Sequence, residues 1–126
     1  MLKSSDDNLF SFQDLKVWQK AVDFAEKVIR AIDQLDSTRR HYRLIEQLEA
    51  ASTSVAMNIA EGKGRQTTKE FIQFLYIARG SLFEVVTLLM IVQRVGWMNE
   101  NTTMEFKKLA LEITKMLNSM IKSMRK

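Results

Sequence analysis

Five polar residues in the middle of the chain have side chains that could take part in chemistry. Asn58, Glu61 and Arg65 follow one another at steps of three and four residues, and Ser81 precedes Glu84 by three. The carboxylates Glu61 and Glu84 would suit general acid–base catalysis, but no nucleophile or electrophile accompanies them. The alternative is a buried network of hydrogen bonds and ion pairs that fixes helix ends and register, with the following loop returning Arg65 toward the carboxylates. We interpret the set as this structural polar network and predict that the chain is not an enzyme.

Basic residues form two candidate contact sites for nucleic acid. A run of arginines surrounds His41 and Tyr42, so cations for phosphate lie beside an aromatic ring on which a base could stack. The alternative is a solvated helix start, although three cations there are mildly unfavourable to the helix dipole. A second basic pair lies at the other end of the same expected helix, so the two patches need not form one surface. The candidate contacts are Arg39, Arg40, Arg43, Lys63 and Arg65.

Several classes of bound group are disfavoured by residue content. The chain has no cysteine and one histidine, so a disulfide framework, a thiolate metal site and the paired Glu-x-x-His motifs of di-iron bundles are excluded. The segment Gly62-Lys63-Gly64-Arg65 lacks the glycine spacing and the Lys-Ser/Thr ending of a phosphate-binding loop. We expect no catalytic, cofactor-binding or metal-binding residues, and no cofactor.

Length and composition predict one soluble all-α domain. The 126 residues include 46% apolar residues, four glycines and no proline, so long helices can form around a single core. The polar start of the chain lacks the apolar stretch of a signal peptide, and no apolar run reaches the length of a membrane span. We expect a cytoplasmic protein with no membrane partner. The formal net charge of +4 is compatible with anionic partners but does not specify one.

The first two helices are expected from apolar residues at helical spacing. After a flexible lead at residues 1–10, a helix capped by Ser11 or Asp14 should run to about Leu35. A second should run from near Thr38 to residue 60 or 61, with Gly62 as its terminating residue. The expected inward face of the first helix comprises Leu15, Trp18, Val22, Ala25, Ile29 and Ile32. The expected inward face of the second comprises Leu44, Leu48, Ala51, Val55 and Ile59.

The third helix carries the most regular apolar pattern in the chain. It should begin at Thr67 or Thr68, with Thr67 and Glu70 spaced as a capping box, and end before Gly96. Its seam alternates steps of four and three through Phe71, Leu75, Ala78, Leu82, Val85, Leu89 and Val92. Further apolar residues widen this surface beyond one stripe, which predicts self-association. A fourth helix should start near Thr102, with Phe106, Leu109, Ile113, Met116, Met120 and Met124 facing inward.

Four helices with short connections predict an antiparallel up-down-up-down four-helix bundle, single-domain over residues 11–126. The order and spacing of several motifs also resemble a known bacterial family. The motifs are Val17-Trp18-Gln19, Gln47-Leu48 with Ala51 and Ser54, Asn58-Ile59-Ala60-Glu61-Gly62, Arg65, Glu70-Phe71, Phe74-Leu75, Ile77-Ala78, and Gly80-Ser81-Leu82 with Glu84. They are similar to those of the four-helix bundle proteins encoded in intervening sequences of 23S ribosomal RNA genes. This resemblance implies a ring-like homopentamer and an association with RNA, and brings no cofactor.

Two departures from the family pattern bear on that expectation. Relatives often have a basic residue where Ala50 stands and a proline where Ala56 stands, so the second helix should be less kinked and less basic there. Two functions follow from the sequence. The first is a non-enzymatic homo-oligomer that binds structured, ribosomal-RNA-related RNA through its basic patches. The second is a protein-binding adaptor or scaffold ring that uses the exposed apolar faces of its third and fourth helices.

Overall fold

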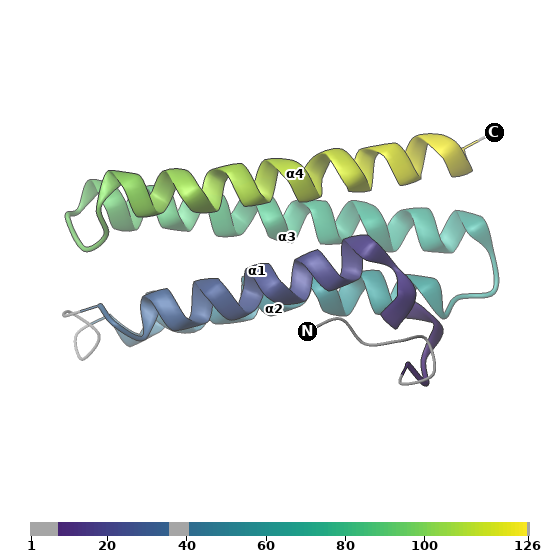
Figure 1. The fold of residues 1–126 in the computed structure, drawn as a ribbon, viewed down its shortest axis with the longest axis horizontal. Helices are drawn as coiled ribbons and strands as arrows, with labels where there is room; N and C mark the ends of the chain where they lie inside the picture. Colours follow the sequence, from purple (N-terminus) through teal and green to yellow (C-terminus); the bar gives the residue numbers. More distant parts are fainter. Residues whose placement is uncertain (1–7, 36–40, 126) are drawn as a thin grey trace.

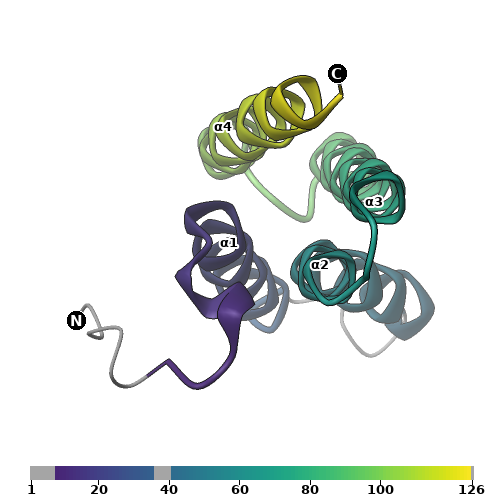
Figure 2. The same cartoon turned by 90° about the vertical axis from the view of Figure 1, so that its right-hand side faces the viewer.

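The computed structural model describes residues 8–35 and 41–125, and within these ranges the chain is an all-α single domain. A 3₁₀ turn, η2 (Ser11–Asp14), precedes the helices α1 (Lys16–Ile32), α2 (Tyr42–Lys63), α3 (Thr68–Arg94) and α4 (Glu100–Met124). Consecutive helices run in opposite directions along a common axis (Figure 1). Seen from one end, they occupy the corners of a square in chain order (Figure 2). The expected four-helix, all-α fold is confirmed.

The start of α1 differs from the expected cap. Leu15, with extended dihedral angles, precedes the helix, and no side chain caps it. Ser11 and Asp14 lie instead in η2, where the Phe10 backbone N–H donates to Gln13 Oε1 at 2.9 Å. The helix ends at Ile32, earlier than the expected Leu35. The N–H groups of Gln34 and Leu35 donate to carbonyl oxygens three residues earlier, as in a 3₁₀ turn, instead of four residues earlier as in an α-helix. The expected start of α2 near Thr38 lies outside the described residues.

The buried face of α1 is rotated from the expected stripe. Of that stripe, Ala25 and Ile32 are buried, whereas Val22 is 36% exposed. The core residues of α1 are Val17, Ala21, Phe24, Ala25, Val28 and Ile32. Both sets have helical spacing, so the positions of α2 and α4 on either side, rather than periodicity, decide which set is buried.

Gly62, near the end of α2, has a packing role that differs from the one expected from the sequence. Gly62 was expected to terminate the helix, but it lies inside α2 and is buried, and Gly64 follows the last helical residue. A Cβ at position 62 would lie 2.7 Å from Phe74 Cβ and 2.9 Å from Phe71 Cδ1. Glycine at this position therefore lets the last turn of α2 approach α3 closely. The predicted inward face of α2 is otherwise confirmed, with its first member, Leu44, half-buried and the others buried.

The expectations for α3 are confirmed at both ends. Thr67 Oγ1 accepts a hydrogen bond from the Glu70 backbone N–H at 3.1 Å. Beyond the helix, Gly96 has φ +90, and Trp97 N–H donates to Val92 O while Gly96 N–H donates to Gln93 O. This pair of bonds is a Schellman motif, in which glycine takes the left-handed conformation. All members of the predicted seam are buried except Phe71, which is half-buried.

The helix α4 begins two residues earlier than expected, because Asn99 caps it by accepting a hydrogen bond from Thr102 N–H at 2.7 Å. Its core face is also rotated from the expected one: Phe106 and Ile113 are buried as expected, but the other expected residues are partly buried and lie at the edge of the core. The buried residues of α4 are Thr103, Phe106, Ala110, Ile113, Leu117 and Ile121.

Packing between the helices is uneven. Among the four pairs of neighbouring helices, α2 and α3 make the most extensive contact and α1 and α4 the least. By length and composition α3 is also apolar enough to cross a membrane. Core helices of soluble proteins pass the same test, and the seam of α3 is buried within the bundle.

Candidate functional site

A chain of three polar side chains joins α2 to α3 at mid-height of the bundle. Ser54 Oγ and Ser81 Oγ are 2.9 Å apart, and Asn58 Nδ2 donates both to Ser54 Oγ at 2.9 Å and to Ser54 O at 2.8 Å. All three residues are half-buried. The structure therefore brings together Asn58 and Ser81 of the predicted polar network through Ser54, which was not part of it.

The charged members of the predicted network lie on the surface, where Arg65 pairs with Glu61 and Glu84 lies apart from both. Arg65 Nη2 is 3.9 Å from Glu61 Oε2, with both side chains about half exposed. Within residues 8–35 and 41–125, Glu84 is exposed and takes part in no ion pair. The expectation of one buried five-residue network is therefore wrong, because α2 and α3 bury only its uncharged part.

The two carboxylates are also too far apart to act together. Since Ser54 and Ser81 lie opposite each other on antiparallel helices, Glu61 is seven residues away in one direction and Glu84 three residues away in the other. Ten residues of helix correspond to about 15 Å at 1.5 Å per residue. This separation does not favour an acid–base pair.

The basic run before α2 is only partly described. Arg39 and Arg40 lie outside the described residues, whereas Arg43 is exposed in the first turn of α2. His41 packs its ring on Trp97, with centroids 3.8 Å apart and planes inclined by 35°. One face of the His41 ring is therefore occupied by the α3–α4 connection. Lys63, at the far end of α2, is about 30 Å from Arg43 along the helix, so the two candidate patches are separate.

A cluster of cations and aromatic rings connects α3 to α4, and the sequence did not indicate it. Arg79 Cζ lies 4.9 Å from the centroid of the Tyr76 ring, and Arg79 Nη1 donates to Asn118 Oδ1 at 2.7 Å. Arg125 Nη2 donates to the Tyr76 hydroxyl, and its Cζ lies 6.0 Å from the same ring. The spacing of Tyr76 and Arg79 on one helical face was a detectable signal, whereas the approach of Arg125 depends on the tertiary fold. We call Tyr76, Arg79 and Arg125 the α3–α4 cation–aromatic cluster.

A third guanidinium packs against another aromatic ring of α3. Arg65 Cζ lies 4.6 Å from the centroid of the Phe74 ring. The end of α2, the start of α3 and the end of α4 all lie at the same end of the bundle (Figure 1). Exposed cations from these segments gather there, with Glu61 and Glu70 as acidic neighbours. The cations are Lys63, Arg65, Lys69, Lys122 and Arg125.

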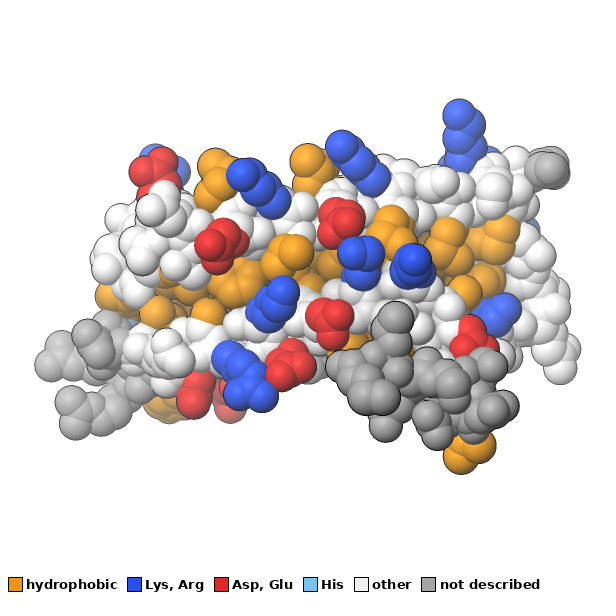
Figure 3. Space-filling model, viewed as in Figure 1, with side chains coloured by type: hydrophobic (Ala, Val, Ile, Leu, Met, Phe, Trp, Pro, Cys, Tyr) orange, Lys and Arg blue, Asp and Glu red, His pale blue; other side chains and the backbone are white. Residues whose placement is uncertain are grey.

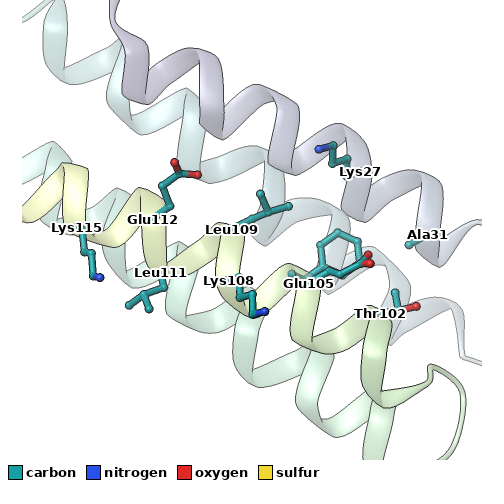
Figure 4. Close-up of a pocket in the computed structure, with 10 residues that line it drawn as sticks. Lys27, Ala31, Thr102, Glu105, Lys108, Leu109, Leu111, Glu112 and Lys115 are labelled. Carbon is teal, nitrogen blue, oxygen red and sulfur yellow. The ribbon is translucent and has the colours of Figure 1, made fainter.

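A shallow groove of about 830 Å³ runs along α4 on the side of α1. Figure 4 shows Lys27 and Ala31 on α1 across from Leu109 on α4, with Glu105 and Glu112 on the same helix as Leu109. An apolar band with charged side chains on both sides marks the boundary between the two helices (Figure 3). Glu112 Oε2 is engaged by Lys20 Nζ at 3.2 Å. Among the described residues no group of three His, Cys, Asp or Glu side chains could hold a metal ion.

The chain matches a family model described as 23S rRNA-intervening sequence protein over residues 13–119. Its fold is similar to the crystal structure of a protein of unknown function from the S23 ribosomal protein family of Bacteroides thetaiotaomicron VPI-5482. The two sequences are 25% identical, and the TM-score is 0.78, with 84% of this chain and 98% of the other covered. No curated protein gives a significant match. The matched span extends from η2 to the last turns of α4.

Proposed function

The chain belongs to the 23S rRNA-intervening sequence protein family, and from this premise we propose that it is a non-enzymatic, cytoplasmic protein that binds structured RNA. The family membership supports an RNA connection only in general terms. The observation that carries the proposal is the α3–α4 cation–aromatic cluster, in which Arg79 and Arg125 lie against one tyrosine ring.

The chemistry of this cluster suits an unpaired region of a folded RNA. Guanidinium planes and aromatic rings stack on bases that are splayed out of a helix, and each stacked base contributes about 1–3 kcal/mol. Each guanidinium has five N–H donors, so Arg79 and Arg125 retain donors for phosphate after their contacts with Asn118 and Tyr76. The other cations at this end of the bundle add a sequence-independent attraction to the RNA backbone.

We also propose that the protein works as a homo-oligomer, pentameric by family resemblance. Support comes from large apolar side chains of α3 that remain exposed, namely Ile77, Met90 and Ile91. Exposed apolar surface of this kind is typical of interaction sites in soluble proteins. Repetition of the cluster around an assembly would strengthen RNA binding through avidity. Sedimentation equilibrium checks the oligomer, and the mass of a single protomer at micromolar concentration would contradict it.

The experiment that tests RNA binding compares two charge-matched double variants. The first, Arg79→Gln with Arg125→Gln, removes two cations from the cluster. The second, Arg30→Gln with Arg94→Gln, removes two exposed cations near the opposite end of the bundle that are not candidate RNA contacts. Fluorescence anisotropy with a labelled 23S ribosomal RNA stem-loop measures the affinity. The first pair should weaken binding about tenfold or more, because the loss of one stacking contact costs about 1–3 kcal/mol and about 1.4 kcal/mol corresponds to a factor of ten in affinity.

The control pair should weaken binding by less, because it removes only long-range attraction. Equal losses in the two variants would show that net charge alone governs binding and would overturn the role of the cluster. A triple change at Arg39, Arg40 and Arg43 tests the basic run before α2 in the same assay. A loss confined to that triple variant would move the RNA contact to the opposite end of the bundle.

A protein-binding adaptor or scaffold ring is the second candidate function. It is favoured by the exposed apolar residues on α3 and α4, which RNA contacts do not explain. Salt separates the two functions, because RNA binding weakens steeply as salt rises whereas apolar docking changes little.

A further inference from the structure

The outer groove between α3 and α4 has an apolar floor. It has a volume of about 650 Å³ and does not include the residues of the α3–α4 cation–aromatic cluster. Its apolar walls are formed by Phe83, Val86, Met104 and Leu111. Three of these side chains are well exposed, with 50% for Phe83, 41% for Met104 and 54% for Leu111.

The hydroxyl groups that line the groove already donate hydrogen bonds within the protein. Thr87 Oγ1 donates to Phe83 O at 2.8 Å, and Thr114 Oγ1 donates to Ala110 O at 2.8 Å. Both hydroxyl donors are therefore satisfied by their own helices, which leaves the methyl groups as the contact surface. An apolar face of a partner would lose few hydrogen bonds by entering this groove.

The charged side chains that line the groove are both lysines, and Glu105 and Glu112 lie beside Lys108 and Leu111 on the adjacent face of α4. The two lysines are Lys107 and Lys108, and Arg79 Cζ approaches the Phe83 ring at 5.9 Å. A two-fold pairing of this face with itself would bring the lysines of both copies together in a poorly hydrated contact. Like charges at such a contact are unfavourable, so a two-fold pairing of this groove with itself is disfavoured.

From the apolar floor and the two lysines that line it, we propose that this groove binds an amphipathic helix with acidic flanks from another protein. The inference rests on the adaptor function and is independent of RNA binding. Leu111 and Met104 are seven residues apart on α4, about 10 Å along the axis. The bound helix would present apolar anchors at i, i+3 or i+4, and i+7 over about two turns. Glu or Asp beside these anchors would meet Lys107 and Lys108.

The test uses three synthetic peptides with the same leucine positions on one helical face. Their flanking positions are all Glu, all Gln or all Lys, and isothermal titration calorimetry measures binding to the full chain. The Glu peptide should bind at least about tenfold more tightly than the Gln peptide, and the Lys peptide least. A variant with Lys107→Gln and Lys108→Gln should remove most of the difference between the Glu and Gln peptides.

A matched apolar pair locates the binding surface. Phe83→Gln with Leu111→Gln should abolish binding, whereas Ile77→Gln should retain it, because Ile77 is equally exposed on α3 but does not line the groove. Preferential binding of the Gln or Lys peptide would preserve an adaptor function and overturn an acidic partner. Failure of all three peptides to bind would overturn the groove as a helix-docking site altogether. A change of sedimentation mass in Phe83→Gln with Leu111→Gln would assign the face to contact between copies instead.

Discussion

Two glycines illustrate how single residues set the spacing of the helices. At position 62 a Cβ would collide with Phe74 and Phe71, whose side chains belong to the first turns of α3. At position 80, in the middle of α3, a Cβ would meet no atom within 4 Å. Close packing therefore explains the glycine at position 62. Contacts among the described residues do not explain the glycine at position 80, where it weakens the helix.

Substitution of these two glycines by alanine should have opposite effects. Gly62→Ala should destabilise the fold by about 1–3 kcal/mol, because an overpacked site forces neighbouring groups to move. Gly80→Ala should stabilise it by about 0.5–1 kcal/mol, because alanine is a better helix former in open space. Urea denaturation monitored by circular dichroism measures both changes. Destabilisation by Gly80→Ala would reveal a close contact at this face, and an unaffected Gly62→Ala would contradict the tight approach of α2 to α3.

Substitutions of the half-buried Asn58 and the exposed Glu84 should differ in their effect on stability. Asn58→Ala should lower the free energy of unfolding by about 1–2 kcal/mol, because it removes two hydrogen bonds to half-buried Ser54. Glu84→Gln should leave stability almost unchanged, because Glu84 is exposed and forms no ion pair with a described residue. Thermal melting at matched concentration distinguishes the two, and equal destabilisation would restore Glu84 to the polar network.

At the scale of elements, α1 carries apolar residues over a wider arc than it buries. Periodicity identified the helix but placed its core stripe on Trp18, Val22 and Ile29, which lie toward the edge of the packed face. Phe24 occupies the core itself, and its ring meets Phe106 of α4 edge-on at 6.2 Å. The buried arc of α1 is therefore decided by the position of α4 as well as by α2.

Two truncations on α1 test this orientation. Phe24→Ala should cost about 3–5 kcal/mol, as expected for a fully buried phenylalanine. Val22→Ala should cost less than about 1 kcal/mol, because Val22 is 36% exposed. Chemical denaturation gives both values. A larger loss for Val22→Ala than for Phe24→Ala would mean that the predicted stripe, and not the observed one, faces the core.

Across the whole molecule, features that depend on neighbours in sequence were predictable. The Thr67 cap, the glycine turn at Gly96 and the seam of α3 all follow from local spacing. Contacts between distant positions were not predictable, because several helix rotations satisfy the same periodicity. Arg125 and Tyr76 are 49 residues apart, and Arg79 and Asn118 are 39 apart. The carboxylates Glu61 and Glu84 likewise appeared as partners only while the register of α2 against α3 was unknown.

The salt dependence of RNA binding tests the central proposal most directly. A titration of the unmodified protein with a labelled 23S ribosomal RNA stem-loop, repeated from low to physiological salt, gives the slope of log K against log salt. We expect measurable binding with a clearly negative slope, because lysines and arginines at the basic end of the bundle displace counterions from phosphates. In Arg79→Gln with Arg125→Gln the slope should become less negative, since two cations are lost. Absence of binding at low salt, or binding with a flat slope, would contradict the proposal.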